Sequence, residues 1–385
     1  MKTKQDKYLN DWKIQEECAE KMLPLVGKLY RERNIVLSVY GRSLVHASTV
    51  ELLKIHRFAR QIIESELSIT KTLPIVESIA RLDLAPARID IGKLAVNFPL
   101  QSSYATVDEY VSAQLGSINT GRKHLRDEGP QDIVLYGFGR IGRLLARLLI
   151  EKAGSGEKFR LCAAVVRKGS SDDLVKRASL LRRDSIHGPF DGIITVDEEE
   201  NAIIANGNLI RIIYSDAPEN VDYTQYGISN AILIDNTGKW RDREGLSRHL
   251  KAPGIAKVIL TAPGKGDVPN VVAGVNNELI VANETVFSAA SCTTNAIVPV
   301  LKAVSDRFGI ISGHVETCHS YTNDQNLIDN YHKAARRGRS APLNMVITET
   351  GAAKAVAKVV PELTGKLTGN AIRVPTPNVS LAILN

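Results

Sequence analysis

Apolar residues at helical spacing dominate the first part of the chain. One such stripe consists of Cys18, Met22, Val26 and Leu29. Capping-box patterns begin at Ser48 and Thr106, each with a glutamate three positions later and apolar residues after it. Residues 116–130 are polar, charged and contain glycine, which is typical of a linker. The pattern therefore predicts an all-α N-terminal extension over residues 1–128.

From Gln131 the pattern changes to short apolar runs that alternate with helical segments. The runs cover residues 132–136, 159–166, 231–235 and 258–261. Short buried strands that alternate with helices are typical of a parallel sheet in an α/β fold. After Ser291 the order becomes helix, strand, long basic loop, helix and two further strands, which indicates an α+β domain.

The composition excludes several classes of protein. Of the 385 residues, 44% are apolar and 24% are charged, as in folded globular domains. No apolar run approaches the ~20 residues that span a bilayer, and the polar start predicts no secretory signal. Cysteines occur only at positions 18, 162, 292 and 318, which is too few for a disulfide framework and predicts a cytoplasmic location. The net charge of +7 favours anionic ligands, either small phosphates or nucleic acid.

A glycine loop follows the first predicted strand of the second region and precedes a helix. Its glycines are Gly137, Gly139 and Gly142, in the spacing G-x-G-x-x-G. In that context the first glycine makes a tight turn, the second lets backbone approach a pyrophosphate, and the third allows close packing of helix and strand. We therefore predict a Rossmann doubly wound parallel sheet over residues 129–290, with a plain tight turn as the alternative interpretation.

Two cations stand where a dinucleotide-binding domain usually has an acid. The second strand ends at Arg167 and Lys168, and a carboxylate at this point would bind the ribose 2′-hydroxyl of NAD. Cations remove the repulsion of a 2′-phosphate and can pair with it. We predict that NADP is tolerated or preferred; in the alternative, both cations are solvated and NAD is used.

Cys292 and His319 are a candidate pair of nucleophile and base. Cys292 lies among small and hydroxylic residues directly before a helix, where the helix dipole favours the thiolate. His319 lies in the strand-like segment 314–321, although most histidines in such segments are structural. We expect Cys18 and Cys162 to be packing residues, and Cys318 to face away from His319 because side chains alternate along a strand.

Five segments give the chain a resemblance to phosphorylating glyceraldehyde-3-phosphate dehydrogenase, in the order and at the spacings of that family. They are Tyr-Gly-Phe-Gly-Arg-Ile-Gly-Arg (136–143), Ala-Ser-Cys-Thr-Thr-Asn (290–295), His-Ser-Tyr-Thr-Asn-Asp-Gln (319–325), Thr-Gly-Ala-Ala-Lys-Ala-Val (350–356) and Arg-Val-Pro-Thr-Pro-Asn-Val-Ser (373–380). The resemblance begins at about Asp132, and residues 1–128 look like the N-terminal extension of a longer bacterial form. It implies a catalytic domain over residues 291–385. Family members continue beyond the equivalent of Asn385, so we expect this domain to be incomplete and the chain itself to be inactive or nearly so.

The resemblance implies a role for each matching residue. Cys292 would attack an aldehyde carbon, His319 would take the proton, and inorganic phosphate would release the resulting thioester as an acyl phosphate. With the two cations described above, the predicted cofactor-binding residues are Gly137, Gly139, Arg140, Ile141, Gly142, Arg167, Lys168, Thr237, Gly238 and Thr261. Thr322 and Arg373 match the site for the phosphate of the substrate, and Ser291, Thr293, Arg337, Thr350 and Gly351 match the site for inorganic phosphate. No metal site is expected.

The chain departs from the usual pattern of the family at three places. Tyr136 replaces an asparagine, for which we expect a change of packing only. Lys168 replaces the ribose-binding aspartate. Asn330 and Tyr331 stand where NAD-restricted members often have leucine and proline. The last two differences both favour use of NADP.

The leading interpretation is an NAD(P)-dependent, phosphorylating oxidation of glyceraldehyde 3-phosphate to 1,3-bisphosphoglycerate, or its reverse, in glycolysis or gluconeogenesis. One alternative is an erythrose-4-phosphate dehydrogenase, which hydrolyses the thioester. Another is a non-catalytic partner- or RNA-binding protein on a dehydrogenase fold, with the basic run 336–339 as a solvated or nucleic-acid-binding loop. We expect a homotetramer with small-molecule phosphate ligands and neither a membrane nor a nucleic-acid partner.

Overall fold

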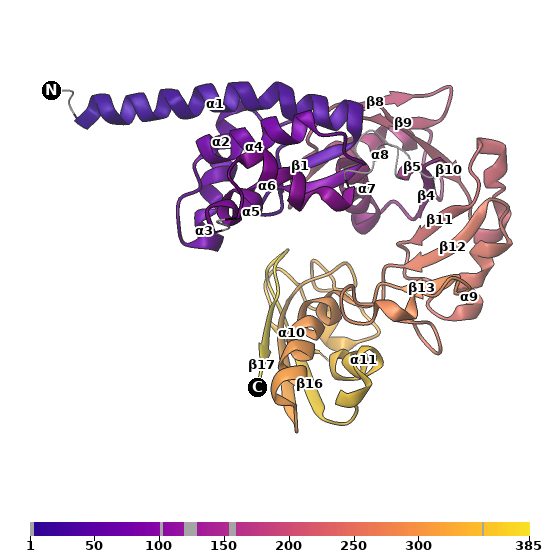
Figure 1. Ribbon diagram of the computed structural model, residues 1–385. Coiled ribbons are helices and arrows are strands. Elements are labelled where there is room, and N and C mark those ends of the chain that lie inside the picture. Colours follow the sequence, from indigo (N-terminus) through magenta and orange to yellow (C-terminus); the bar gives the residue numbers. More distant parts are fainter. Residues whose placement is uncertain (1–3, 101–102, 119–128, 154–158, 349) are drawn as a thin grey trace. The chain divides into compact units, whose positions relative to one another are not determined.

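The computed structural model describes residues 4–100, 103–118, 129–153, 159–348 and 350–385 (Figure 1). The chain forms two compact units. The first consists of Met1–Gln131 and Leu149–Arg160, and the second of Asp132–Leu148 and Leu161–Asn385. Most of the predicted linker lies in residues 119–128, outside the described residues, and Gly116–Ile118 before it form a short 3-10 helix.

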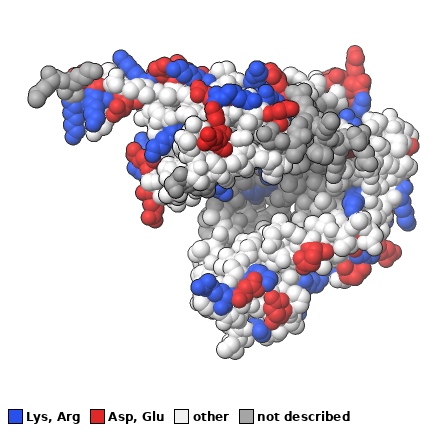
Figure 2. Space-filling view, in the orientation of Figure 1, with Lys and Arg blue, Asp and Glu red and all other residues white. Residues whose placement is uncertain are grey.

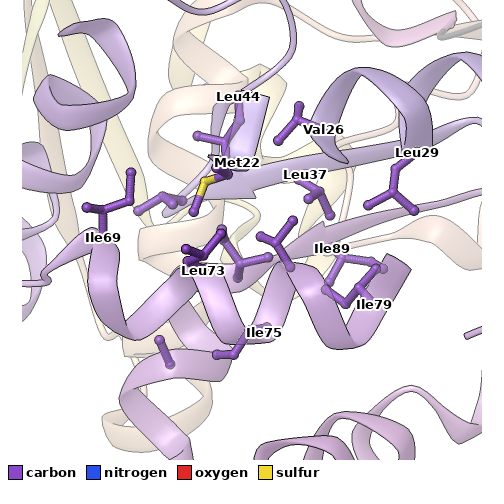
Figure 3. Close-up of a cluster of buried hydrophobic side chains, with 14 of the residues drawn as sticks. Met22, Val26, Leu29, Leu37, Leu44, Ile69, Leu73, Ile75, Ile79 and Ile89 are labelled. Atoms are coloured by element: carbon purple, nitrogen blue, oxygen red, sulfur yellow. The ribbon is translucent and has the colours of Figure 1, made fainter. Parts of the chain in front are cut away.

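Helices make up most of the first unit. They are α1 (Lys4–Arg33), α2 (Thr49–Phe58), α3 (Arg60–Ile63), α4 (Ile69–Arg81), α5 (Ile91–Asn97) and α6 (Val107–Gln114). The predicted stripe on α1 turns Met22, Val26 and Leu29 into the core, where they meet apolar residues of α4 (Figure 3). Cys18 is only partly buried at its edge. The predicted cap at Ser48 is a complete capping box, which fixes the start of α2.

The prediction of an all-α extension is wrong, because the first unit also contains a three-stranded sheet in the order β2-β1-β3. Its strands are β1 (Ile35–Val39), β2 (Arg42–Ser43) and β3 (Ala87–Asp90). Every residue of β1 is buried, and a short, continuously apolar run of this kind does not distinguish a buried strand from a helix. Asp90 stabilises the edge of this sheet, because its carboxylate accepts hydrogen bonds from the backbone N–H groups of Tyr40 and Gly41 at 3.1 Å.

The N-terminal part of α1 carries exposed apolar side chains. Tyr8 and Trp12 lie one helical turn apart and are 65% and 44% exposed. They continue, at heptad spacing, the stripe that is buried further along the helix. The first turns of α1 extend past the helices on which the rest of it packs (Figure 1).

The second unit contains the predicted doubly wound sheet, in the order β13-β12-β11-β4-β5-β10-β9-β8. The strands are β4 (Gln131–Tyr136), β5 (Phe159–Val166), β8 (Ile194–Asp197), β9 (Ala202–Ala205), β10 (Asn208–Tyr214), β11 (Ala231–Asp235), β12 (Ile255–Leu260) and β13 (Val286–Ser288). The helices are α7 (Arg140–Ala153), α8 (Asp173–Arg182) and α9 (Arg243–Ser247), and β6 (Arg183–Asp184) pairs with β7 (Gly188–Pro189). The strands from β13 to β4 are parallel, as predicted for this fold, whereas β9 pairs antiparallel with β10 and β8. The sequence predicted strands β4, β5, β11 and β12 and missed β8, β9, β10 and β13.

The α+β region after Ser291 is also confirmed. Its sheet has the order β15-β16-β14-β17. Its elements are α10 (Cys292–Phe308), β14 (Gly313–Ser320), β15 (Val346–Thr348), α11 (Ala352–Val359), β16 (Leu367–Val374) and β17 (Leu381–Leu384). Helices α10 and α11 pack on each other and share one apolar core with β14 (Figure 1). Strands β14 and β16 are parallel, and their register pairs His319 with Arg373.

None of the helices in the described ranges is long and apolar enough to cross a membrane.

Gly142 is the glycine of the loop on which packing depends most. A Cβ atom at Gly142 would lie 2.2 Å from the carbonyl oxygen of Gly137, whereas one at Gly139 would have no heavy atom within 4 Å. We predict that Gly142→Ala lowers the free energy of unfolding by about 1–3 kcal/mol, because the loop must shift to relieve the overlap. Gly139→Ala is the matched control and leaves this free energy unchanged. Urea unfolding of both variants checks the prediction, and equal stabilities would contradict it.

Candidate active site

The glycine loop lies between the end of β4 and the start of α7, as the sequence predicted. Gly137 has a φ of +93°, which favours glycine, and its N–H donates to the carbonyl of Val165 at 2.9 Å. Gly139 faces open space and leaves room for a ligand beside its backbone. The chain therefore fits a dinucleotide pyrophosphate at the N-terminus of α7.

An open pocket adjoins this loop at the ends of the strands. It is lined by Tyr136, Gly137, Phe138, Val165, Val166, Arg167, Arg177, Ser215, Asp216, Thr237, Lys239 and Trp240. The fully buried Asp235 holds Thr237 in this lining, because its carboxylate accepts hydrogen bonds from the backbone N–H and the hydroxyl of Thr237, both at 2.7 Å. The other carboxylate oxygen of Asp235 lies 3.1 Å from Nε2 of the buried His249.

Tyr136 has the packing role expected of it. Its ring contacts His249 and Trp240 edge-on, with centroids 4.7 and 5.8 Å away. Burial raises the pKa of the Tyr136 phenol to about 12, so the group is neutral and acts as an aromatic surface of the pocket.

The structure distributes the predicted cations differently from the sequence analysis. Arg167 lines the pocket, but the ammonium of Lys168 lies over the ring of Tyr214, 5.3 Å from its centroid. A third cation, Arg177 of α8, also lines the pocket. Its guanidinium pairs with Asp173 at 2.5 Å and donates to the carbonyl of Arg167 at 2.9 Å. Sequence reasoning missed Arg177 because it lies on the following helix, ten residues beyond Arg167. Its spacing of four residues from Asp173, which is typical of an ion pair on a helix, was the only feature of the sequence that could have indicated it.

The remaining predicted cofactor residues surround the loop without lining the pocket. Arg140 begins α7 and donates to the carbonyl of Pro377 at 3.3 Å, and Ile141 beside it is 48% exposed. Gly238 has a φ of +61° in the turn after β11. The hydroxyl of Thr261 donates to the carbonyl of Asp235 at 3.1 Å and ties the ends of β11 and β12 together.

Cys292 is the first residue of α10 and is exposed. Ser291 caps this helix, because its hydroxyl accepts a hydrogen bond from the N–H of Thr294 at 3.0 Å. The thiol therefore lies where the helix dipole stabilises negative charge.

The structure brings Cys292 and His319 together, with 3.6 Å between Sγ and Nε2. The hydrogen bond from His319 lowers the pKa of the Cys292 thiol from 9.0 to about 7, and bonds from Thr293 act in the same direction. The same contact with Cys292 raises the pKa of His319. A substantial fraction of the thiol is consequently a thiolate near neutral pH.

Several predicted phosphate-binding residues gather beside this pair. Arg373 donates to the hydroxyl of Thr322 at 3.3 Å, and Arg337 pairs with Asp324 at 2.5 Å. Thr322 also donates to Asp324. The carboxylate of Asp324 thus organises two of the predicted donors, a role that its sequence position did not indicate.

Thr350 and Gly351 lie at the start of α11, where the Thr350 hydroxyl accepts from the N–H of Ala352 at 3.1 Å. In the basic loop, Arg336 donates to the carbonyl of Ile347 and Arg339 pairs with Asp329 at 2.6 Å. Arg336 therefore has its partner in β15, and Arg339 has its partner within the loop.

The other cysteines have no comparable setting. Cys162 donates to the carboxylate of Asp132 at 3.2 Å, and Cys318 lies next to His319 in β14.

Over the residues that the structure describes, no group of three or more histidine, cysteine or acidic side chains could hold a metal ion. The dinucleotide-binding fold is typical of the nucleotide-dependent oxidoreductases, and a thiol with a lowered pKa beside an imidazole has the chemistry of a nucleophile and its base.

Two family models match the chain. That of the glyceraldehyde 3-phosphate dehydrogenase NAD-binding domain matches residues 131–243, and that of the C-terminal domain matches residues 291–385. The chain belongs to the glyceraldehyde-3-phosphate dehydrogenase family, and its cofactor is NAD(P). The match to the C-terminal domain covers residues 291–385, which is the region predicted to be the catalytic domain.

Curated relatives agree with this assignment. The chain is 61% identical over 366 residues to a glyceraldehyde-3-phosphate dehydrogenase-like protein of Pseudomonas aeruginosa. The aligned region covers 94% of this chain and 79% of the relative. This match extends into the N-terminal extension, as expected for a longer bacterial form. Identity is 42% to the chloroplastic glyceraldehyde-3-phosphate dehydrogenase A of Zea mays, over 73% of this chain and 68% of the relative. It is also 42% to the glyceraldehyde-3-phosphate dehydrogenase of Zymomonas mobilis, over 65% of this chain and 71% of the relative.

The contact between Cys292 and His319 predicts the pH dependence of thiol alkylation. In the parent chain the alkylation rate of Cys292 has its midpoint near pH 7. His319→Ala removes the main cause of the lowered pKa, so the midpoint moves up toward 9.0 and the rate at pH 7 falls by more than about tenfold. The kinetics of alkylation by iodoacetamide measure both the midpoint and the rate at pH 7. Cys292→Ser gives the background alkylation of the other cysteines. An unchanged midpoint in His319→Ala would show that the histidine does not activate the thiol.

Proposed function

We propose that the protein catalyses the phosphorylating oxidation of glyceraldehyde 3-phosphate to 1,3-bisphosphoglycerate, or the reverse reaction. The observation that carries this proposal is the 3.6 Å contact between the Cys292 thiol and the His319 imidazole at the N-terminus of α10. Membership of the family supports the substrate, and the cluster of Thr322, Arg373 and Arg337 beside the pair supports a phosphorylated ligand.

In the proposed mechanism Cys292 acts as nucleophile and His319 as general base and acid. The proton of the Cys292 thiol passes to His319, the thiolate attacks the aldehyde carbon, and the carbonyl oxygen takes this proton from His319 to become the hydroxyl of a thiohemiacetal. His319 accepts the hydroxyl proton as the carbon–hydrogen bond breaks and the thioester forms. Bound NAD(P) supplies the acceptor for the hydride. Inorganic phosphate then attacks the thioester, which yields the acyl phosphate and frees Cys292.

Two anion subsites are needed for this sequence of steps. We assign the phosphate of the substrate to Thr322 and Arg373, and inorganic phosphate to Ser291, Thr293, Arg337, Thr350 and Gly351. Arginine forks and hydroxyl groups are suitable donors to phosphate, and the start of α11 adds backbone N–H groups at Thr350 and Gly351.

An assay of the first turnover separates this reaction from its alternative. With glyceraldehyde 3-phosphate and NAD(P) but no phosphate, we expect one equivalent of reduced cofactor, followed by arrest at the thioester. Added phosphate should restore continued turnover. His319→Ala should slow the first equivalent by about 10²–10⁴-fold, because the general base is lost. Cys292→Ser should give no reduced cofactor.

The same measurement can contradict the proposal. Sustained turnover without phosphate would favour hydrolysis of the thioester, as in erythrose-4-phosphate dehydrogenase. Reduction of the cofactor by the Cys292→Ser variant would contradict the covalent mechanism. The absence of a first equivalent of reduced cofactor from the unaltered chain would also contradict the proposal.

We also propose that NADP is accepted, and that Arg167 and Arg177 contact its 2′-phosphate. Both line the pocket, whereas Lys168 lies over Tyr214. Arg167→Ala removes only the guanidinium, because Arg177 bonds to the backbone carbonyl of residue 167. We predict that this substitution weakens NADP binding about tenfold and leaves NAD binding unchanged. Lys168→Ala is the matched control and has the smaller effect on NADP binding. Calorimetric titration measures the affinity of each of the two variants for NADP and for NAD. Equal loss for both nucleotides would contradict the assignment.

For its assembly we propose a homo-oligomer, expected to be a tetramer, in the cytoplasm. Exposed apolar side chains on α1 (Tyr8 and Trp12) and on α10 (Val300, Val304 and Phe308) support contacts with other copies. No disulfide bond joins the four cysteines, all of which lie in the described residues, and this agrees with a reducing compartment.

The non-catalytic alternative has less support. On the face shown in Figure 2, basic and acidic side chains are interspersed rather than gathered into a basic surface. Arg336, Arg337 and Arg339 of the basic loop all have partners within the protein, although Arg336 and Arg339 are exposed, so part of the charge of the run 336–339 is compensated.

A further inference from the structure

The hydroxyl of Ser288 joins two loops that adjoin the reactive cysteine. Ser288 is the last residue of β13 and is fully buried. Its Oγ donates to the carbonyl of Ala262 at 2.6 Å and accepts from the backbone N–H groups of Gly264 at 3.1 Å and Ala290 at 3.0 Å. A hydroxyl has one proton to donate and two lone pairs, so these three bonds use its whole capacity.

One of these loops lies on the nucleotide side and the other on the side of the nucleophile. Residues 262–264 follow Thr261, a predicted cofactor-binding residue just beyond the end of β12. Ala290 lies two residues before Cys292, between β13 and the residue that caps α10. A single oxygen atom therefore fixes the backbone of both loops to the end of β13.

The backbone of Ala290 is strained and needs such support. Its φ is +57°, in the left-handed region, where the Cβ atom crowds the following carbonyl oxygen. Its side chain is 4% exposed and belongs to the apolar core that α10 and α11 share. Strained residues of this kind persist only where the surrounding structure holds them, and they are often found at active sites. Without the bond to its N–H, the turn could relax, and the start of α10 would shift with it.

Asn295 of α10 holds the same turn from the other side. Its Nδ2 donates to the carbonyl of Ala289 at 2.7 Å and to the carbonyl of Ser291 at 2.9 Å. The carbonyl groups before and after residue 290 are thus held by the helix, whereas the N–H of residue 290 is held by Ser288 of β13. The position of the turn consequently depends on both elements.

Asn270 takes part in the hydrogen bonds of Ser288 on the nucleotide side. Its Oδ1 accepts from the N–H of Gly264 at 2.9 Å and lies 3.1 Å from the Ser288 oxygen. Its Nδ2 donates to the carbonyls of Gly264 at 3.2 Å and Val268 at 3.0 Å. Loss of the Asn270 side chain would therefore loosen the loop 262–264 and leave the bond between Ser288 and Ala290 in place.

We propose that Ser288 is a positioning residue for the reaction, whose hydroxyl holds the turn at Ala290 so that Cys292 stays within reach of His319. This inference rests on the proposed function, since it takes Cys292 to be the nucleophile. The partners of the hydroxyl are backbone groups and the amide of Asn270, none of which titrates, so Ser288 acts on the thiol through geometry and not through charge.

Charged groups face the thiol from two strands, with His319 on β14 and Arg373 on β16. Both remain in place when the hydroxyl of Ser288 is removed, because neither bonds to it in the described part of the chain. A change in the titration of Cys292 would then report a change in the position of its sulfur.

Alkylation of Cys292 by iodoacetamide in the free chain tests the inference, because the pH midpoint of the rate reports the contact with His319. In Ser288→Ala we expect the midpoint to rise by about one pH unit from its value near 7, and the rate at pH 7 to fall about fivefold, since a displaced thiol loses part of its bond to the imidazole. Asn270→Ala is the matched control and should leave the midpoint unchanged. A merely structural role of Ser288 would lower the stability and leave the midpoint of both variants unchanged.

The outcomes separate the inference from the proposed function. If the midpoint moves in His319→Ala but not in Ser288→Ala, the positioning role is wrong and the proposed function stands. If it moves in neither variant, the reactive pair that carries the proposed function is wrong, and the inference falls with it. An equal shift in Asn270→Ala would mean general loosening of the site and would also overturn the inference.

A measurement on the unaltered chain covers the case in which Ser288→Ala does not fold. Hydrogen exchange, followed by nuclear magnetic resonance, reports whether the N–H of Ala290 is bonded. We expect this N–H to exchange at least about 100-fold more slowly than in an unfolded chain. Exchange at the rate of an unfolded chain would show that Ser288 does not hold the turn, and the inference would be wrong.

Discussion

Helix α10 begins at Cys292, close to the end of β14 that carries His319, and this meeting of two element ends sets the 3.6 Å between sulfur and ring nitrogen. The helix provides its dipole and the cap at Ser291, and the strand provides a rigid support for the imidazole. Neither residue would be reactive alone, because the lowered pKa of the thiol depends first on the histidine. Binding of nucleotide and phosphate is useful only around this pair.

The sequence was most informative where a local pattern of residues is compatible with only one kind of secondary structure. The apolar runs after Gln131 are bounded by turns and alternate with helices, so strands β4, β5, β11 and β12 of the large sheet were predictable, whereas its other strands were missed. The glycine loop was recognisable because the strand before it and the helix after it could also be recognised in the sequence. In the extension, by contrast, β1 is apolar on both faces and has no period that separates strand from helix, so its sheet was missed.

Residues that act through distant partners were harder to find. Arg177 reaches the pocket from a helix, and Asp324 organises donors that lie up to thirteen positions away. Spacing along the chain does not report such convergence, which depends on the turns between elements. The contact between His319 and Arg373 depends likewise on the register of β14 and β16, which follows only from the assembled sheet.

The strand that carries His319 lies in the interior of its sheet, between β16 and β17, whereas Thr322 and Arg337 lie in the loop that follows. A central strand tolerates few changes, because both neighbours fix its backbone, but a loop can change in length and composition. Evolution could therefore alter which aldehydes this enzyme accepts by remodelling the loop while the reactive pair stays in place, and laboratory selection for new substrates has its natural target there.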